Sequence, residues 1–519
     1  MKRQQKETLP NDIEALKQLI LAQQDSLAKK QDRIQLLEEQ IILFQHRQFG
    51  KSSEKSAQQA ELFDETESEV NLDAPEIVAS IEDESNVKQI PVAKAKSGRK
   101  PLPKSLPRVR VEHDLPEADK LCQCGCQKVC IGEDTSEQLD IIPAVIQVLV
   151  NARKKYACKH CENGVAIAAL PKQPIPKSNA SPGLLAHIAV AKYQDGLPLY
   201  RMETIFKRLK LHLPRNTQAN WMIKSSELLQ PLYNLLNDRL LESRYIHMDE
   251  TPVQVLNEPG KSAESKSYMW VRRTGDRENP ITLFDYHPNR SAAVVSSLLA
   301  DYKGYLQTDD YASYLKIGAS EGITHLGCMA HARRKFIDAQ KIAPSMKGKV
   351  SKADMAVKLI KVLYAIETEI KDKTAAERLL VRQQKSVPQL DKIRAWLNKS
   401  LQNTLPKGKA GIAIAYLHKN WEKLTAYSQD GRLNIDNNPV ENAIRPFAIG
   451  RKNWMFSSSQ SGAKASAMLY SVIETAKANG LEPYAYLRTL FTQLPGCETV
   501  ENYESLLPWN VDIEPYIKS

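Results

Sequence analysis

The sequence predicts a multidomain α/β protein whose main domain is interrupted by a large helical insertion. The chain has 519 residues, more than a single hydrophobic core usually organises. Strand-like runs gather between residues 244 and 327 with one helical run among them, which is typical of a mixed sheet. Residues 331–430 then follow a helical pattern with few strand signals. We therefore expect a sheet domain from 236 to 480 that contains a helical insertion at about 340–430.

A heptad pattern over residues 12–46 predicts a coiled-coil helix within the first 50 residues. Eight of its ten seam positions are apolar, and the two polar ones are Gln23 and Lys30. Polar seam residues can set the register of paired helices, so we expect a homodimer or a higher oligomer. The alternative is a helix that packs against its own protein.

Residues 51–110 have the composition of a charged linker that contains proline. No Lys or Arg lies between residues 56 and 87, whereas residues 88–110 hold eight Lys or Arg and no acid. An extended Arg-Lys-Pro segment can lie in a narrow minor groove, which makes Arg99 and Lys100 candidate DNA contacts. A solvated tether that contacts nothing explains the composition equally well.

Six of the eight cysteines lie between Cys122 and Cys161, inside a segment, 111–170, that predicts a small zinc-ribbon-like module. Crowded cysteines in a reducing compartment indicate a metal site before they indicate disulfides. Cys158 and Cys161 have the spacing of a zinc knuckle, but the earlier cysteines do not. Loss of the zinc site is the alternative.

The segment 171–235 predicts helices at 184–194, 199–210 and 215–229. The break at 211–214 resembles the turn of a helix-turn-helix unit, and Arg215 opens the helix that follows it. Arg215 is therefore a candidate DNA contact. The alternative is an ordinary set of packed helices.

The sheet domain predicts strands at 244–249, 252–256, 268–273, 281–286, 304–309 and 323–327, and a helix at 291–300. An amphipathic run at 465–478 stops at Asn479 and Gly480, a pair typical of a helix C-terminus. Residues 481–519 follow as a C-terminal element.

Three acidic residues lie where elements of this domain begin or end. Asp249 and Asp309 each end a predicted strand, and Glu441 lies near the start of a predicted helix. Such ends can converge at one edge of a sheet and hold two Mg²⁺ or Mn²⁺ ions. Each acid also has a structural explanation, namely a polar turn, a helix N-cap, and an ion pair with Arg445. Their order along the chain favours the metal site.

The charge of the chain favours an anionic partner. The formal net charge is +11. Cations follow Glu441 closely, so Arg445, Arg451 and Lys452 are candidate contacts to DNA phosphates. No stretch has the length and hydrophobicity of a membrane span or a signal peptide, which predicts a cytoplasmic protein.

Several long strings in the chain resemble bacterial transposases of insertion sequence family sixty-six. The resemblance rests on residues 440–456 (VENAIRPFAIGRKNWMF), 49–55 (FGKSSEK), 98–103 (GRKPLP), 106–108 (LPR), 156–161 (YACKHC), 328–336 (CMAHARRKF) and 479–484 (NGLEPY). It implies a DDE transposase with an RNase-H-like catalytic domain that cuts element ends and joins them to target DNA. It also implies a nucleoid-associated bacterial protein and accessory proteins from the same element.

The resemblance assigns the catalytic residues as Asp249, Asp309 and Glu441. The family usually has Asp-Gly at the second acid, whereas this chain has Asp309-Asp310, which leaves Asp310 as a small rival. Arg333 and Arg334 lie in a matching basic string and are candidate DNA contacts. Cys328 and His331, with His325 nearby, resemble a second metal set, but we expect them to pack near the active site.

Comparison with the family's first knuckle places the structural zinc on Cys122, Cys124, Cys158 and Cys161. Cys126 is the alternative for either early position. The leading functional prediction is a metal-dependent transposase that acts on double-stranded DNA. The alternative is a catalytically inactive, zinc-containing DNA-binding protein derived from a transposon.

Overall fold

The computed structural model describes residues 12, 14, 15, 17–27, 30, 33, 34, 146–157, 165–342 and 350–513. Residues 17–27 are helical, but most of the predicted heptad lies outside the described residues, so the pairing of helices stays a prediction. The linker with Arg99 and Lys100 lies outside them too, as do the predicted zinc ligands Cys122, Cys124, Cys158 and Cys161 and the alternative Cys126.

Two strands that flank the second cysteine pair in the sequence form a short antiparallel hairpin. Strand β1 (Lys155–Ala157) pairs with β2 (Val165–Ile167), with Lys155 opposite Ile167. The guanidinium of Arg153 donates to the Ala168 carbonyl at 2.6 Å, which extends the closure of the hairpin. Residues 74–171 form a unit distinct from the one that contains residues 172–513.

The larger unit is built on a mixed sheet, as the sequence predicts. Its order is β5-β4-β3-β6-β7, and a short strand β8 (Ser457–Ser459) adds to the far end of β3. Strands β3, β4 and β5 are antiparallel, whereas β6 and β7 run parallel to β3. The strands are β3 (Tyr245–Asn257), β4 (Lys266–Thr274), β5 (Thr282–His287), β6 (Gly304–Gln307) and β7 (Ile323–Leu326).

The central strand β3 is a single strand where the sequence predicts two. It pairs with β4 continuously from Ile246 to Gln254, straight through Pro252. On its other side it pairs with β6 only as far as His247 and with β8 only from Val255. Pro252 lies between these two stretches, and a strand position with one unpaired side tolerates a residue that has no N–H.

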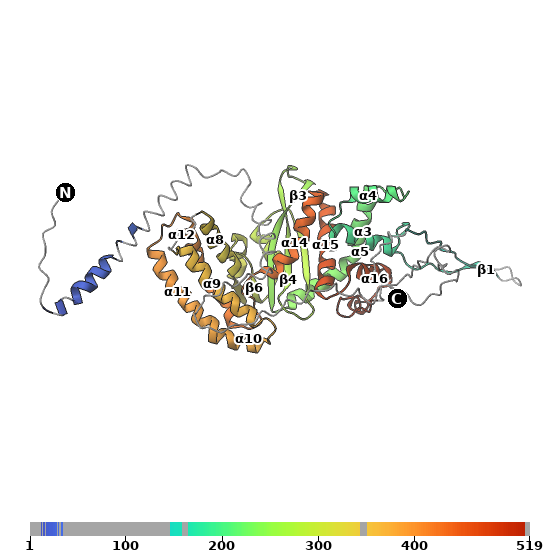
Figure 1. Cartoon of the computed structure of the whole chain (residues 1–519). Coiled ribbons are helices and arrows are strands. Elements are labelled where there is room, and N and C mark those ends of the chain that lie inside the picture. The colour runs from blue at the N-terminus through green and yellow to red at the C-terminus, as the bar shows by residue number, and fades with distance from the viewer. Residues whose placement is uncertain are drawn as a thin grey trace, which may run out of the picture. The chain divides into compact units, whose positions relative to one another are not determined.

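Helices before and after the sheet domain cover the strands β4 and β5 and share one hydrophobic core with them. Figure 1 shows α3, α5 and α16 together on one side of the strands and α14 and α15 beside β3 and β4. These helices are α3 (Pro182–Tyr193), α4 (Leu199–Arg208), α5 (Arg215–Glu242), α14 (Asn438–Trp454), α15 (Gln460–Ala478), α16 (Pro483–Gln493) and α17 (Val500–Glu504). Two further helices, α6 (Ala292–Leu299) and α7 (Ala312–Gly318), connect β5 to β6 and β6 to β7.

Helix α15 protects the outer strand of the sheet. The hydroxyls of Ser471 and Thr475 accept from the backbone N–H groups of Phe284 and Thr282 at 2.7 and 3.0 Å. An outer strand otherwise presents unpaired backbone groups that favour aggregation. The helix ends where the sequence predicts, and Gly480 follows with a φ of +75°, a conformation that glycine adopts without strain.

The segment between β7 and α14 is helical and has a hydrophobic core of its own. Two of its helices begin with a capping box, at Ser351 with Asp354 and at Thr374 with Glu377. Its elements are α8 (Met329–Ile342), α9 (Lys352–Glu369), α10 (Ala375–Val381), a π-helical turn (Arg382–Ser386), α11 (Val387–Gln402), α12 (Lys409–Lys419), α13 (Trp421–Thr425) and a 3₁₀ turn (Ala426–Gln429).

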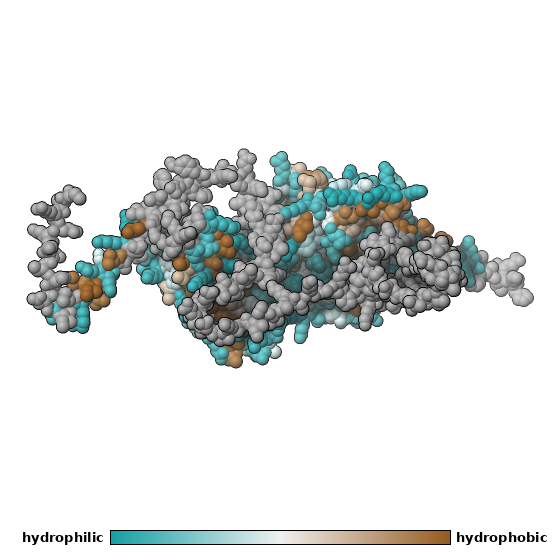
Figure 2. All heavy atoms as spheres, in the orientation of Figure 1, coloured by the Kyte–Doolittle hydropathy of each residue, from teal (hydrophilic) through white to brown (hydrophobic). Residues whose placement is uncertain are grey.

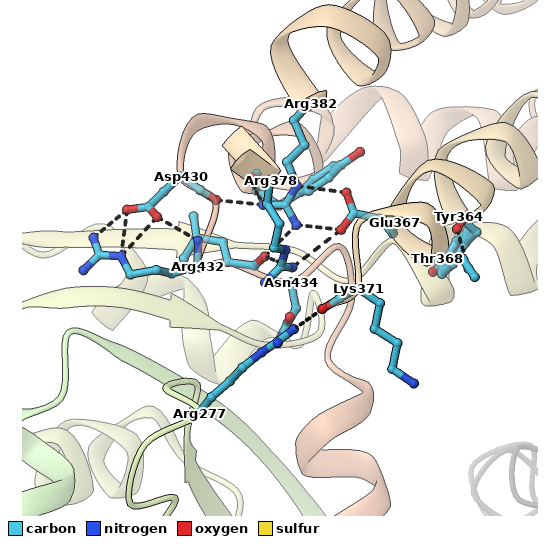
Figure 3. Close-up of polar contacts among 12 residues, drawn as sticks. Arg277, Tyr364, Glu367, Thr368, Lys371, Arg378, Arg382, Asp430, Arg432 and Asn434 are labelled. Atoms are coloured by element: carbon cyan, nitrogen blue, oxygen red, sulfur yellow. Dashed lines mark hydrogen bonds and ion pairs between the residues drawn. The ribbon is translucent and has the colours of Figure 1, made fainter. Parts of the chain in front are cut away.

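A buried arginine joins this helical insertion to the segment that returns to the sheet (Figure 3). Arg382 is fully buried and makes a two-pronged ion pair with Glu367, at 2.9 and 2.6 Å. It also donates to the carbonyls of Tyr427, Asp430 and Leu433. An arginine held at every donor fixes the path of the backbone it contacts, which here leads directly into α14.

Candidate active site

Strand register places two of the three predicted acids side by side. Because β3 and β6 are parallel with His247 opposite Gln307, Asp249 lies two residues further along β3 and Asp309 lies two residues beyond the end of β6. A carboxylate oxygen of Asp249 accepts from the N–H of Glu250 at 2.8 Å, and one of Asp309 accepts from the N–H of Tyr311 at 2.9 Å. Each carboxylate keeps a second oxygen for a further ligand.

Glu441 reaches the same place from the first turn of α14. The start of this helix is tied to β3 through Asn437, which is fully buried. The amide of Asn437 donates to the Met248 carbonyl at 3.2 Å, and its oxygen lies 2.9 Å from Nδ1 of His247. The Asn437 carbonyl in turn accepts from the Glu441 N–H at 3.3 Å. The third acid is therefore positioned from the backbone of the strand that carries the first.

The three acids interact electrostatically. Burial raises the pKa of Asp249 well above its ordinary value, and the negative charges of Glu250, Asp309 and Glu441 raise it further. Burial and like charge both oppose ionisation of Asp249. A cation among these carboxylates would therefore offset the electrostatic repulsion between them. The structure thus places Asp309 and Glu441 within electrostatic range of Asp249.

Glu250 is a neighbour of this cluster that sequence reasoning missed. It is buried, and it contacts the guanidinium of Arg290 and the hydroxyl of Tyr314 through short hydrogen bonds. Burial raises its pKa to about 7 against the opposing effect of Arg290. The available signal is its place in a strand, where adjacent residues face opposite sides and two successive acids seldom both face solvent.

Asp310, the rival of Asp309, is turned toward the helical insertion. Its carboxylate lies 2.9 Å from the ammonium of Lys419 and 3.9 Å from that of Lys423. Burial favours a higher pKa, but these lysines and the hydrogen bonds of Lys419 and Asn420 lower it overall. Its charge is therefore balanced by cations, unlike that of Asp249.

Cys328 and His331 lie against Glu441. The Glu441 Oε1 atom is 4.0 Å from the Cys328 sulfur and 3.6 Å from His331 Nδ1. The sulfur is buried and accepts from the Asn437 N–H at 3.2 Å. Burial, followed by the charge of Glu441, raises the pKa of the Cys328 thiol. His325 is separate from this cluster, because its ring bonds to the Thr308 hydroxyl at 2.8 Å and burial lowers its pKa to about 4.

The predicted DNA-contacting cations differ in their surroundings. Arg334 lies 3.9 Å from Glu441 Oε2, so it borders the acidic cluster. Arg451 turns inward, donating to the Thr251 hydroxyl at 3.1 Å and to the Pro252 carbonyl. Lys452 is exposed, and Arg333 and Arg445 are half-buried. Their contacts with DNA stay predictions.

A second basic surface lies on the α4–α5 unit. Met202 and Phe206 are the buried residues of α4. Figure 2 shows hydrophilic residues along the outer side of this helix, next to a hydrophobic patch. The break between the helices is held by Gln218, whose amide donates to the Leu213 carbonyl at 2.9 Å. Exposed cations of this unit are Arg201, Lys207, Arg208, Lys210 and the predicted contact Arg215.

Comparison with known proteins places this geometry in a family. A model described as the transposase IS66 family matches residues 177–465, which hold all three acids. The chain belongs to this transposase family. Further IS66 models match residues 471–509, a C-terminal element, and residues 119–162, a zinc-finger binding domain. A model described as transposase C of IS166 homeodomain matches residues 36–111, which lie outside the described residues.

Two similar proteins are uncharacterized proteins of Sinorhizobium fredii (strain NBRC 101917 / NGR234). The protein y4qI is 32% identical over 541 residues and covers 97% of both chains. The protein y4jD is 34% identical over 421 residues and covers 79% of this chain and 81% of its own. IS66 transposase domains indicate an enzyme that acts on DNA with divalent metal, and they include a zinc-binding domain. No helix among the described residues is both long and apolar enough to cross a membrane.

Proposed function

We propose that this protein is a DDE transposase that cleaves DNA strands at insertion-element ends and transfers them to target DNA. The electrostatic coupling of Asp249 with Asp309 and Glu441 carries the proposal. The strand order, with three antiparallel strands followed by two parallel ones, supports an RNase-H-like catalytic domain. The helical insertion falls between the second acid and the third.

The residues present fit a pair of divalent cations. Asp249 would hold both ions, while Asp309 and Glu441 would each hold one, and carboxylate oxygens are the ligands that Mg²⁺ and Mn²⁺ prefer. Paired ions supply an activated water or 3′-hydroxyl and stabilise the oxygen that leaves. The protein's own part is to hold the three carboxylates in place. Asn437 does so for Glu441, and the Asp249 side chain is fixed by the Glu250 N–H.

The DNA partner would be bound by several basic elements. The α4–α5 unit supplies Arg215 and its exposed neighbours for the duplex, and Arg333, Arg334, Arg445 and Lys452 would contact phosphates near the acids. Arg451 donates inward to β3 and would support this surface from beneath. Arg99 and Lys100 would extend this contact into the minor groove. A structural zinc on Cys122, Cys124, Cys158 and Cys161, a dimer formed by the heptads, and accessory proteins of the same element complete the proposal.

The deciding experiment is Mg²⁺-dependent cleavage of DNA that carries the ends of the encoding element. Asp249→Asn, Asp309→Asn and Glu441→Gln should each abolish cleavage. Asp310→Asn is the matched control, because it removes a neighbouring carboxylate that pairs with Lys419, and it should retain most of the activity. Full activity in the first three variants would overturn the proposal. Specific end binding without cleavage by the unaltered protein would support the inactive DNA-binding alternative.

A further inference from the structure

One side-chain cluster is not explained by a magnesium-dependent site. Three potential ligand atoms of different kinds, from Cys328, His331 and Glu441, all lie within 4.8 Å of one another. Mg²⁺ selects oxygen ligands and makes little use of sulfur or imidazole. A thiolate, an imidazole and a carboxylate together are instead the ligands of Zn²⁺ and similar transition metals.

The distances in this cluster approach those of a tetrahedral site. Zinc bonds of the usual lengths place sulfur and oxygen, or nitrogen and oxygen, roughly 3.3–3.5 Å apart. The corresponding separations are 4.0 Å from Cys328 to Glu441 and 3.6 Å from His331 to Glu441, both to Oε1. These two separations exceed the bonded values by about half an ångström or less, and the Cys328 and His331 ligand atoms lie within 4.8 Å of each other. A small inward movement of the three side chains would therefore complete three bonds and leave a fourth position for water.

The surroundings of each ligand agree with this assignment. Nδ1 of His331 is buried and has no hydrogen-bond partner within the described part of the chain. The Asn437 N–H donates to the Cys328 sulfur at 3.2 Å, a contact that stabilises a thiolate. Arg334 faces the other carboxylate oxygen, Oε2, so Oε1 is directed at the sulfur and the imidazole.

We propose that Cys328, His331 and Glu441 form an inhibitory site for a thiophilic divalent cation of the zinc class. Occupancy takes Glu441 Oε1 away from the Asp249–Asp309 pair and so prevents assembly of the magnesium site. The inhibitory part of this inference rests on the proposed function, whereas the binding part stands without it. The residues of this site are different from the cysteines at 122–161 that are proposed to bind structural zinc.

The binding test uses the full chain and Co²⁺, which reports a thiolate bond by its absorption. The unaltered protein should bind one equivalent more than Cys328→Ser, with a stronger sulfur-to-cobalt band. Cys497→Ser is the matched control, because Cys497 is the other described free cysteine and lies outside the cluster, and it should behave as the unaltered protein does. Equal stoichiometry and equal spectra in all three would overturn the proposal.

A second variant covers the case in which Cys328→Ser fails to fold. His331→Gln changes a half-buried residue, so it should fold, and it keeps the Cys328 sulfur. Because it removes the imidazole ligand, it should weaken Co²⁺ binding at this site at least tenfold. An unchanged affinity in a folded His331→Gln protein would be decisive against the site.

The inhibition test measures Mg²⁺-dependent cleavage with and without micromolar Zn²⁺, each variant against its own zinc-free rate. The unaltered protein and Cys497→Ser should lose at least tenfold, and His331→Gln should lose less than twofold. Equal inhibition in all of them would remove the regulatory role. Absence of any cleavage would instead count against the proposed function, while the Co²⁺ measurement would still decide the binding site.

Discussion

The side-chain amide of Asn437 donates to the backbone carbonyl of Met248 at 3.2 Å. This bond joins the residue before Asp249 to the residue that opens α14, one helical turn ahead of Glu441. A separation of almost two hundred residues in sequence is thereby closed by one buried amide. The distance between the first and third acids depends on it more than on any local preference for strand or helix.

Asn437→Ala should uncouple α14 from β3. It removes the bonds to Met248 and His247 and leaves buried groups unpaired, which costs about 2–3 kcal/mol of the free energy of unfolding. We also expect a loss of cleavage greater than tenfold at a temperature where the variant remains folded. Chemical unfolding and initial cleavage rates measure the two effects.

Asn438→Ala is the control, since the side-chain oxygen of Asn438 has no hydrogen-bond partner within the described residues. It should change either quantity little. Equal effects in the two variants would show that Asn437 has no special role in placing α14.

Arg382→Met should weaken the connection between the insertion and the acidic cluster. It leaves Glu367 without its closest cation and removes one donor from each of three carbonyls, and breaking a buried pair costs on the order of 3–5 kcal/mol. Lys385→Met breaks the exposed pair with Glu369 instead and should cost less than about 1 kcal/mol. Thermal unfolding of the three proteins gives the comparison.

Asp249→Asn should stabilise the metal-free protein while it abolishes cleavage. It removes a half-buried charge that lies among Glu250, Asp309 and Glu441, and relief of this kind commonly adds about 0.5–2 kcal/mol. Mg²⁺ should raise the unfolding temperature of the unaltered protein and not that of the variant, because only the former gains a ligand. A lower stability of Asp249→Asn in chelator would contradict the repulsion.

His247 should make the fold sensitive to acid. Burial, together with the charge of Arg273 and against the Asn437 hydrogen bond, lowers its pKa from 6.5 to about 4. The unfolded chain therefore binds the proton first, so the contribution of the neutral ring is complete above pH 6.5 and is lost as the pH falls toward 4. Between pH 6.5 and 5 this loss is about 2 kcal/mol.

Urea unfolding at the two pH values, followed by tryptophan fluorescence, tests the assignment. His247→Gln should lose about 2 kcal/mol less than the unaltered protein over this interval. His418→Gln, at an exposed position, should show the same pH dependence as the unaltered protein. Identical curves for all three would remove His247 as the sensitive group.

Much of the sheet could be predicted from the sequence because its signals are local. Alternation and β-branched runs located the strands. The prediction that Asp249 ends a strand was wrong, because β3 continues to Asn257, whereas Asp309 does lie just beyond the end of β6. The prediction of two strands separated before Pro252 was wrong. Whether a proline interrupts a strand depends on which side of the strand is paired, and this pairing is set by residues distant in sequence.

The supporting residues of the candidate site could not be predicted in the same way. Asn437, Glu250 and Arg382 have their roles through partners on other elements of the fold, at Met248, Arg290 and Glu367, which are 189, 40 and 15 residues away in sequence. Polar residues of these types are common on surfaces, so only the fold identifies them as buried. The sequence did indicate that Cys328 and His331 lie near the acids, but not that both contact Glu441.

The chain runs through the entire insertion before it reaches α14. Arg382 of the insertion donates to the Leu433 carbonyl, in the segment that leads into α14. Partial melting of these helices would release Glu441 and would also expose Tyr245 of β3 and Leu326 of β7, which belong to the same hydrophobic core. Brief warming should therefore abolish the proposed cleavage activity reversibly, before the protein precipitates. Transposition of the encoding element would then be limited by temperature.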